Sequence, residues 1–447
     1  MKEKKNKVKR KIDKQAVFNV ISFGFILGCC VFYGGRFIKL YKENNKEVEV
    51  VQNTLSQGIK NDNFSEKYFN NVFGEYYFVN DVDKNYVKYS NILWRILKIN
   101  SDNELVLVSD KPLTSLAFNP SSDDYISSDV NKWMNTNDEV ENTGILESQL
   151  NNKAKYLVKN KVCIDEVNEI KNTKCSNYNG DNYINLLSIN DYINSGADKS
   201  YINNDTNFYL ANLNKDKEVW YVNDSKKLTT SDKEDLLGVK AVITINSSVE
   251  KVNGDGTKDN PYMFEQEKGL FGSYVKINED IWQIYDVKED SVNLVLNNYL
   301  MVNGKEVLNS YSQVDYRYNP KSSNSLANYL NNKYLNSLPY QGIININSWK
   351  NSNYDLDNED NYKNMFSNVV NAKVGLLSIG DIIINNDLTD YSLMSGRYSL
   401  IYNYHNNGTL KSMNITTKNH VVPTININKS LINEGEGTIE SPYLIKY

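Results

Sequence analysis

Apolar and polar side chains alternate through residues 86–99, which read YVKYSNILWRILKI. Ile92, Trp94 and Ile96 fall on one face of this segment, with the period of two that is typical of a half-buried β-strand. A turn-forming stretch, NSDN, follows, and residues 104–110 (ELVLVSD) then resume the apolar run. The pattern therefore predicts a β-hairpin at this point of the chain.

The same pattern occurs a second time. Residues 274–287 (YVKINEDIWQIYDV) repeat the first strand segment, and residues 420–445 repeat residues 238–264. Matching residues keep similar separations: Trp94 to Trp282 is 188 residues, Ser188 to Ser378 is 190, and Gly254 to Gly435 is 181. A nearly constant period indicates tandem copies of one module. We place module 1 at residues 75–265 and module 2 at residues 266–447.

Each module has the same predicted order of elements. After the hairpin comes a short helix, at residues 127–135 and 323–331, in which Trp133 and Tyr329 are the expected core residues. The segment INLLSINDYI then predicts a buried strand that enters a helix capped by Ser188 or Asn190. Two strand pairs and a β-branched closing strand complete the module. The predicted fold class is therefore α+β, mostly antiparallel strand with short helices.

The N-terminus predicts a membrane anchor. Residues 16–35 (AVFNVISFGFILGCCVFYGG) contain no charged residue, and about 20 apolar residues span a hydrocarbon core as a helix. Eight basic residues precede this segment, so the positive-inside rule keeps residues 1–15 cytoplasmic and exports the chain after Arg36. Residues 36–74 are interpreted as a stalk. We expect a single-pass protein of the cell membrane with extracellular modules.

A second interpretation of the same segment stays open. Residues 26–29 (ILGC) resemble a bacterial lipobox, in which Cys29 would be lipidated after signal cleavage. A conventional cleaved signal peptide is less favoured, because no small-x-small site closes the apolar run. The anchor and the lipoprotein both leave the modules tethered to the membrane and facing outward.

The charge distribution excludes one class of partner. Residues 1–42 hold 11 basic and 2 acidic residues, which leaves 39 basic and 53 acidic residues and a formal charge of −14 for the rest. An acidic exported region is a poor match for nucleic acid. The 33 Tyr against 14 Phe accompany many Asn and Lys, which is typical of a compositional bias toward A/T-rich codons.

The cysteines fall into two pairs. Cys29 and Cys30 lie in the apolar segment, whereas Cys163 and Cys175 lie in module 1 with no histidine nearby. Outside the cell, a nearby pair favours a disulfide over a metal site. We therefore predict a Cys163–Cys175 disulfide that closes a hairpin.

The sequence offers little for catalysis or cofactors. Its two histidines, His405 and His420, both lie in module 2 and have Asn223 and Gly238 as counterparts in module 1. No nucleophile–base–orienter set is evident from motifs. No glycine-rich phosphate loop occurs either. We predict no catalytic residue and no cofactor.

Two kinds of binding site remain as hypotheses. Acidic turns with Asp255, Asp259, Asp355 and Asp357 offer oxygen ligands of the type that calcium prefers, although none has EF-hand spacing. Aromatic residues gather on the two late strand pairs, where a sugar ring could stack while amides bond its hydroxyls. The members of this aromatic set are Tyr209, Trp220, Tyr221, Tyr391, Tyr402 and Tyr404.

The order of short motifs resembles a family of uncharacterised domains in surface proteins of low-GC Gram-positive bacteria. The motifs of that family are LWRV, WLN, FLLS, WWLRS and GVRPAL. The matching pieces of module 1 are WRI (94–96), WMN (133–135), LLS (186–188) and VKA (239–241), and those of module 2 are WQI (282–284), YLN (329–331), LLS (376–378) and VVP (421–423). The order is also similar to that of C-type-lectin and formylglycine-generating-enzyme folds.

The chain departs from this family at its arginines. The family's Arg in WWLRS is Ala211 in module 1 and Met394 in module 2, and its Arg in GVRP is Lys240 and Val422. Arg95 is likewise replaced by Gln283. The resemblance itself implies no known activity. The duplication, the predicted anchor and the lack of a catalytic motif instead indicate a non-catalytic surface module that binds envelope glycan or a surface protein. A structural spacer in an envelope complex, and an enzyme with its site in one module only, are the alternatives.

Overall fold

The structure is a computed structural model that describes residues 54–63, 68–80, 82–119, 123–170, 174–351, 361–384, 388–405 and 407–446. The chain divides into two units, Met1–Asn53 and Thr54–Tyr447, and the described residues all belong to the second. The predicted cytoplasmic tail, anchor and first part of the stalk thus lie outside the described residues. Within them, no helix has both the length and the apolar character needed to cross a membrane.

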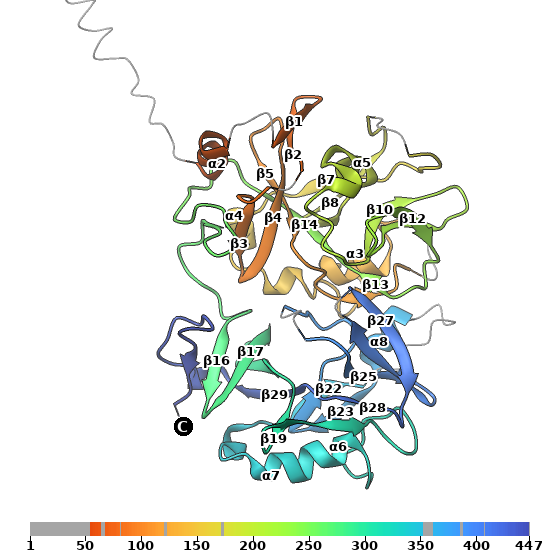
Figure 1. The fold of residues 1–447 in the computed structure, drawn as a ribbon, viewed down its shortest axis with the longest axis vertical. Coiled ribbons are helices and arrows are strands. Elements are labelled where there is room, and N and C mark those ends of the chain that lie inside the picture. The colour runs from red at the N-terminus through yellow and green to blue at the C-terminus, as the bar shows by residue number, and fades with distance from the viewer. Residues whose placement is uncertain are drawn as a thin grey trace, which may run out of the picture. The chain divides into compact units, whose positions relative to one another are not determined.

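The described residues form a strand-rich α+β fold, which confirms the predicted class (Figure 1). The α-helices are short because the apolar runs that would extend them are used by strands. They are α2 (Leu55–Asn63), α3 (Asp129–Met134), α4 (Lys153–Tyr156), α5 (Ile189–Asn194), α6 (Leu326–Asn328), α7 (Leu335–Ser337) and α8 (Asn361–Ser367). Between α6 and α7 the helix widens into one π-type turn, Tyr329–Tyr334.

The first sheet is built from module 1 and from β1, which lies in the last part of the predicted stalk. It has the order β1-β2-β4-β5-β14-β9, with β3 paired to β4 and β15. All of its pairings are antiparallel except β3 with β15. Its strands are β1 (Phe69–Val72), β2 (Glu75–Phe78), β3 (Tyr86–Tyr89), β4 (Ile92–Ile99), β5 (Leu105–Ser109), β9 (Ile184–Leu186), β14 (Ala241–Ile245) and β15 (Tyr262–Met263). The predicted hairpin is the β4–β5 pair, in which Trp94 lies opposite Ser109.

The second half carries a six-stranded sheet of the order β24-β29-β18-β17-β16-β30. Its strands are β16 (Tyr274–Ile277), β17 (Asp280–Val287), β18 (Ser291–Leu296), β24 (Val374–Leu376), β29 (Pro423–Asn428) and β30 (Tyr443–Leu444). Figure 1 shows green strands from the start of this half in one sheet with blue strands from its end. The first sheet runs through the corresponding sequence segments in the same order, β9-β14-β5-β4-β3-β15.

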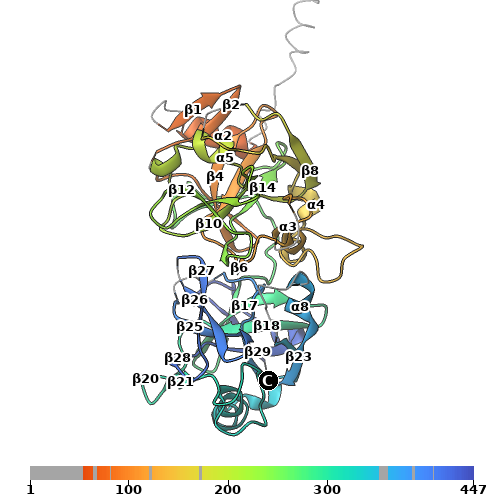
Figure 2. The same cartoon turned by 90° about the vertical axis from the view of Figure 1, so that its right-hand side faces the viewer.

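A ten-stranded sheet combines strands from both halves, in the order β12-β11-β10-β13-β27-β26-β25-β28-β21, with β6 paired to β13 (Figure 2). Its strands are β6 (Ser115–Leu116), β10 (Phe208–Leu213), β11 (Val219–Val222), β12 (Leu228–Ser231), β13 (Leu237–Gly238), β21 (Leu308–Ser310), β25 (Tyr391–Arg397), β26 (Leu400–His405), β27 (Thr409–Asn414) and β28 (Lys418–His420). The halves meet where Leu237 pairs with Thr409. The two sequence modules therefore share one compact unit.

Three two-stranded ribbons complete the fold: β7 (Asn160–Cys163) with β8 (Tyr178–Asn182), β19 (Met301–Val302) with β20 (Lys305–Glu306), and β22 (Asn347–Lys350) with β23 (Val369–Ala372). The β7–β8 and β22–β23 ribbons each precede a short buried strand, β9 or β24. They matter for function because each forms one wall of a cleft described below.

The predicted short helix has different packing in the two halves. Trp133 of α3 is fully buried, as expected, but Tyr329 is only half-buried, and its neighbour Leu330 is the buried residue. The expectation for Tyr329 was therefore wrong, because the π-type turn that begins at this residue rotates the helix face. Asn135 and Asn331 nevertheless make matching contacts, since each bonds both the N–H and the carbonyl of one residue on β9 or β24.

Candidate functional site: a cleft in the first module

The aromatic set predicted as a sugar-stacking surface is mostly buried. Tyr209, Trp220, Tyr391, Tyr402 and Tyr404 are all at most 9% exposed, and only Tyr221 is half-buried. Their strands lie within the ten-stranded sheet, so their rings fill the core on its two faces. The Trp220 indole N–H, for example, donates to the carbonyl of Val167 at 2.8 Å. The six residues therefore do not form a surface on which a sugar could stack, and this hypothesis is corrected.

Asp255, one of the calcium candidates, lies in a turn whose own residues donate hydrogen bonds to its carboxylate. Its carboxylate accepts hydrogen bonds from the N–H and the hydroxyl of Thr257, at 3.0 and 2.7 Å. The backbone bond and then the hydroxyl bond from Thr257 lower the pKa of Asp255. Asp259 lies in the same exposed turn, whereas Asp355 and Asp357 lie outside the described residues. The turn itself depends on Gly254, since a Cβ there would lie 2.0 Å from the carbonyl oxygen of Pro261.

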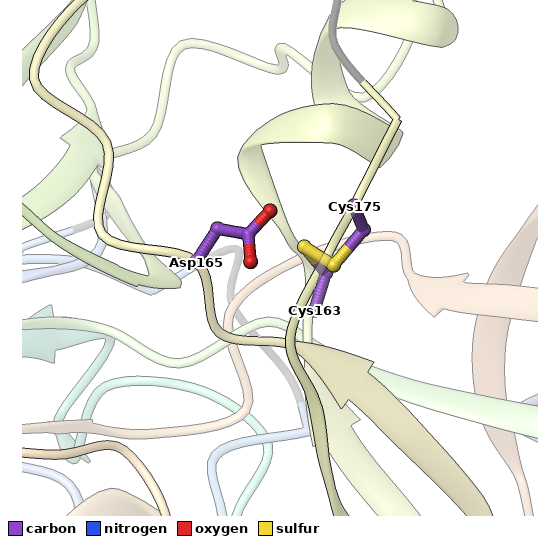
Figure 3. Close-up of side chains that lie close together, drawn as sticks. All are labelled: Cys163, Asp165 and Cys175. Carbon is purple, nitrogen blue, oxygen red and sulfur yellow. A yellow bond between two sulfur atoms is a disulfide. The ribbon is translucent and has the colours of Figure 1, made fainter.

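The predicted pair Cys163 and Cys175 is a disulfide with a Cα–Cα distance of 5.9 Å. It closes the loop that joins β7 to β8, as the sequence indicated. Asp165 lies beside the two sulfur atoms, and these three residues form the one cluster of potential metal ligands among the described residues (Figure 3). Sulfur atoms bonded to each other are not thiolate ligands. Asp165 instead accepts hydrogen bonds from Ser176 and Asn177 and fixes the loop.

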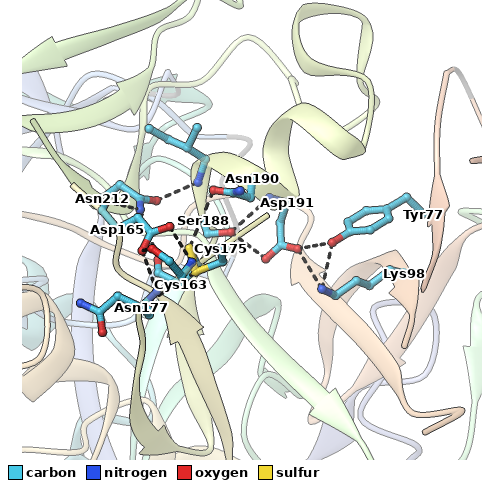
Figure 4. Close-up of a disulfide and its surroundings, with 12 residues drawn as sticks. Tyr77, Lys98, Cys163, Asp165, Cys175, Asn177, Ser188, Asn190, Asp191 and Asn212 are labelled. Atoms are coloured by element: carbon cyan, nitrogen blue, oxygen red, sulfur yellow. Dashed lines mark hydrogen bonds and ion pairs between the residues drawn. A yellow bond between two sulfur atoms is a disulfide. The ribbon is translucent and has the colours of Figure 1, made fainter. Parts of the chain in front are cut away.

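The disulfide-closed ribbon forms one wall of a cleft of about 620 Å³. The opposite walls come from the β1–β2 turn, the end of β4, and α5 with the strand before it. The cleft thus brings together four segments that are distant in the sequence. Figure 4 shows its centre, where Tyr77 and Lys98 point toward Asp191 on α5 and the disulfide lies to one side.

A charged cluster occupies the centre of this cleft. The Lys98 ammonium lies 2.9 Å from a carboxylate oxygen of Asp191 and 3.0 Å from one of Glu75. The Tyr77 hydroxyl donates to the same Asp191 oxygen at 2.6 Å and also contacts Lys98 at 3.0 Å. Two carboxylates therefore share one ammonium, which leaves the cluster with a net negative charge.

The ionisation of the cluster follows from these contacts. Burial alone would raise the pKa of Asp191, but the charge of Lys98 and the hydrogen bonds from Tyr77, Lys98 and Ser188 outweigh it and lower that pKa. Burial would likewise lower the pKa of Lys98, but Asp191, Tyr77 and Glu75 hold it well above its usual range. The pair is thus fully ionised at neutral pH, and Lys98 is an ammonium rather than a nucleophilic amine.

The local sequence explains why Asp191 points into the cleft. Ser188 is the N-cap of α5, and its hydroxyl accepts the Asp191 N–H at 3.1 Å. The same hydroxyl lies 2.9 Å from an Asp191 carboxylate oxygen. A Ser-x-x-Asp sequence at a helix start places the acidic side chain beside the cap. The alternative cap from the sequence, Asn190, lies within the helix instead.

Amides and exposed aromatic rings surround the charged centre. Asn185 and Asn194 line the cleft, and each has a buried side-chain oxygen with no hydrogen-bond partner among the described residues. The Asn185 amide N–H₂ donates to the carbonyl of Asn160 at 3.0 Å. Phe73 and Tyr178, which are 69% and 55% exposed, lie among the lining residues. The lining therefore combines amides, opposite charges and open aromatic faces.

The corresponding place in the second half is nearly filled. Ser378 and Asp381 take the positions of Ser188 and Asp191, and Asp381 is paired with Lys350 at 3.0 Å. The cavity there is about 180 Å³. The Trp349 ring packs over Gly375, where a Cβ would lie 2.6 Å from the ring. In the first half, the matching positions of the ribbon and the strand are Val162 and Asn185, which leave the space open.

The two histidines lie far from this chemistry, on strands of the second half. His405 is paired with Asp390 at 2.7 Å, and burial lowers its pKa. His420 is paired with Glu306 at 3.1 Å, and its ring stacks on Tyr299. Neither lines the cleft. The cleft therefore holds charges and hydrogen-bonding groups but no imidazole base among its described residues.

Arg95 of module 1 is held by neighbouring aromatic rings and hydrogen bonds. The Arg95 guanidinium lies between the rings of Tyr86 and Tyr201, at 3.9 and 4.7 Å from their centroids. It also donates to the side chain of Asn85 and to the carbonyl of Val82. Arg95 thus fastens the residues before β3 to the sheet. All of these partners of the guanidinium belong to the protein itself.

The sequence did not single out Tyr77, Lys98 or Asp191 as site residues. One signal was present, since LLSINDY and LLSIGDI each place an aspartate three residues after a serine. Comparison with family models, with curated proteins and with solved structures finds no match for this chain. The functional interpretation therefore rests on the chemistry of the cleft.

Proposed function

We propose that this protein is anchored in the membrane of a bacterium and binds envelope glycan at the cell surface through the cleft of its first module. The observation that carries the proposal is the lining of that cleft. The amides of Asn185 and Asn194, the ion-paired centre at Lys98 and the exposed ring of Tyr178 all border one cavity. Hydroxyl-rich and amide-bearing sugars offer groups that match each of these features.

The unpartnered amide oxygens favour a polar ligand over an apolar one. A buried oxygen without a donor costs free energy of about 1–3 kcal/mol. Both oxygens are closed to solvent, so a sugar hydroxyl or acetamide N–H would supply such a donor once the Asn185 or Asn194 side chain turned toward the cleft. Tyr178 and Phe73 would cover the apolar face of a sugar ring.

The duplication fits a binding role in which one copy kept its cleft. The second half retains the Ser-x-x-Asp arrangement but fills the space with Trp349. Ser188 acts as a helix cap, and the Asp191 carboxylate beside its hydroxyl is already paired with Lys98. We therefore propose a non-catalytic module, and the spacer role becomes the outcome if no ligand binds.

Co-sedimentation of the unit Thr54–Tyr447 with cell-wall sacculi tests the proposal. We expect saturable binding that persists at high salt, because stacking and neutral hydrogen bonds are weakly screened. Tyr178→Ala should weaken this binding at least several-fold. Tyr398→Ala removes an equally open ring from the second half, 70% exposed, and should leave binding unchanged. Equal loss in both variants, or no binding by the unaltered unit, would reject the cleft as a glycan site.

The membrane arrangement needs its own experiment. Residues 16–35 predict the anchor, and the acidic region after it predicts export. Protease treatment of intact cells should degrade the modules and leave the N-terminal tail protected. Modules that resist the protease on intact cells but not after lysis would place them inside and overturn the proposal.

A further inference from the structure

A second group of reactive side chains lies in module 1, away from the cleft. Lys240 follows β13 and is fully buried. Its amine donates to the carbonyl of Ile202 at 2.7 Å and to the side-chain oxygen of Asn204 at 2.9 Å. The Phe208 ring covers it, with the centroid 4.8 Å from the nitrogen. A lysine amine is therefore held against a carboxamide in a site from which bulk water is largely excluded.

The Asn204 carboxamide is fixed and polarised. Its oxygen accepts hydrogen bonds from Lys240 and from the Thr206 hydroxyl, which lies at 2.8 Å. Its N–H₂ group donates to the backbone carbonyl of Asp110. The Thr206 hydroxyl stays on this oxygen when the amine attacks and withdraws electron density from the carbon, as in an oxyanion hole. The carbon next to Lys240 is thus prepared for attack by an amine.

Two charged groups act on Lys240. They are Asp110 and Arg95, whose side chains lie 3.6 Å apart as an ion pair. Burial lowers the pKa of Lys240 to about 7, in opposition to the charge of Asp110 and with the help of Arg95. A large fraction of Lys240 is therefore the neutral amine at physiological pH, and this form is the nucleophile.

We propose that Lys240 and Asn204 form an intramolecular amide bond. The Lys240 Nζ lone pair attacks Cγ of Asn204, and the resulting oxyanion is stabilised by the Thr206 hydroxyl. One proton passes from the attacking nitrogen to the leaving N–H₂ group. The bond between Cγ and that nitrogen then breaks and ammonia departs. One C–N bond forms and one breaks, so no oxidant or other reactant is needed.

The bond would close the chain around β10, β11 and β12. These strands lie between Asn204 and Lys240 in sequence, and β10 pairs with β13 just before Lys240. The second half has Val422 at the corresponding position, so the bond belongs to module 1 alone. With the disulfide, module 1 would carry two covalent links.

Peptide mapping of the purified full chain tests the bond. Trypsin should fail to cleave after Lys240, and residues 200–215 should appear joined to residues 234–251 with a mass one ammonia below the sum of the two peptides. Cleavage after Lys240 together with a free 200–215 peptide of unaltered mass would overturn the proposal.

Two variants test the two side chains. Asn204→Ala and Lys240→Arg should abolish the joined peptide in protein whose circular dichroism is unchanged. Lys227→Arg, at an exposed lysine, serves as the control and should leave the joined peptide intact. A joined peptide of normal abundance in Asn204→Ala or Lys240→Arg would overturn the proposal.

Discussion

Asp191 and Asp381 occupy matching positions, three residues after Ser188 and Ser378, but their lysine partners come from different strands. Lys98 at the end of β4 lies 2.9 Å from Asp191, whereas Lys350 at the end of β22 lies 3.0 Å from Asp381. The position that matches Lys98 in the second half is an acid, Asp286. Lys350 of the β22–β23 ribbon therefore supplies the cation that β17 lacks. Asp381, like Asp191, thus keeps an ion pair with a lysine.

Removal of Lys98 should destabilise the protein strongly. Lys98→Met leaves Asp191 and Glu75 without their shared cation in a mostly buried site, and such a loss costs about 3–5 kcal/mol of unfolding free energy. Urea unfolding of the unit Thr54–Tyr447 measures it. The control is Lys276→Met, which removes the exposed pair with Glu279 and should cost about 0–1 kcal/mol. Similar losses in the two variants would contradict a buried ion pair at Lys98.

Asp286 and Asp191 should make the stability of the protein depend on pH in opposite ways. Burial raises the pKa of Asp286 more than Lys350 and Lys288 lower it. A carboxyl whose folded pKa is raised contributes stability below its unfolded pKa of about 4, and that contribution is lost as pH rises through the folded pKa. Asp286→Asn should therefore gain stability relative to the unaltered protein from about pH 4 to pH 7.

Asp191→Asn provides the opposite comparison. The pKa of Asp191 is lowered, so its contribution is present above the unfolded pKa of about 4 and is lost as pH falls through the folded pKa. Compared with the unaltered protein, this variant should be destabilised most at neutral pH, and the difference should shrink in acid. Melting temperatures across the pH range give both profiles, and parallel profiles for the two variants would contradict the assignments.

The disulfide should stabilise the cleft wall measurably. It closes a separation of 12 residues, and a loop of this size corresponds to about 3 kcal/mol in the chain-entropy treatment. The double variant Cys163→Ala, Cys175→Ala should melt lower by several degrees and lose its response to reductant. Calorimetry with and without dithiothreitol checks this. An unaltered protein whose melting temperature ignores reductant would show that the bridge carries no stability.

Trp349 and Gly375 should behave as a coupled pair. Gly375→Ala brings a methyl group against the Trp349 ring and should cost about 1–3 kcal/mol. Trp349→Val leaves a cavity and should cost about 3 kcal/mol. The double variant should lose less than the sum, because valine makes room for the methyl group. Gly342→Ala, with no atom near its Cβ, is the control, and strict additivity would contradict the packing.

Much of the strand framework was predictable from local patterns. The alternation around Trp94, the cap at Ser188 and the glycine turn at Gly254 each depend on residues close in the sequence. The hairpin disulfide was predictable for the same reason, since Cys163 and Cys175 lie only 12 residues apart. The prediction of an exposed aromatic surface was wrong, because strand period alone does not show whether a second layer of residues covers the outer face of the sheet. Burial of Tyr209 and Tyr404 follows from that layer.

The sequence by itself determined the repeated order of segments and the local geometry of strands, caps and turns, because these arise from interactions between near neighbours in the chain. Only the tertiary structure decided where functional groups meet. Lys98 contacts Asp191 across 93 residues, and Asn204 contacts Lys240 across 36, because sheet pairing brings together the segments that carry or adjoin them. It also decided that one cleft is open and the other filled, since a single large side chain, Trp349, takes the space that Val162 leaves free.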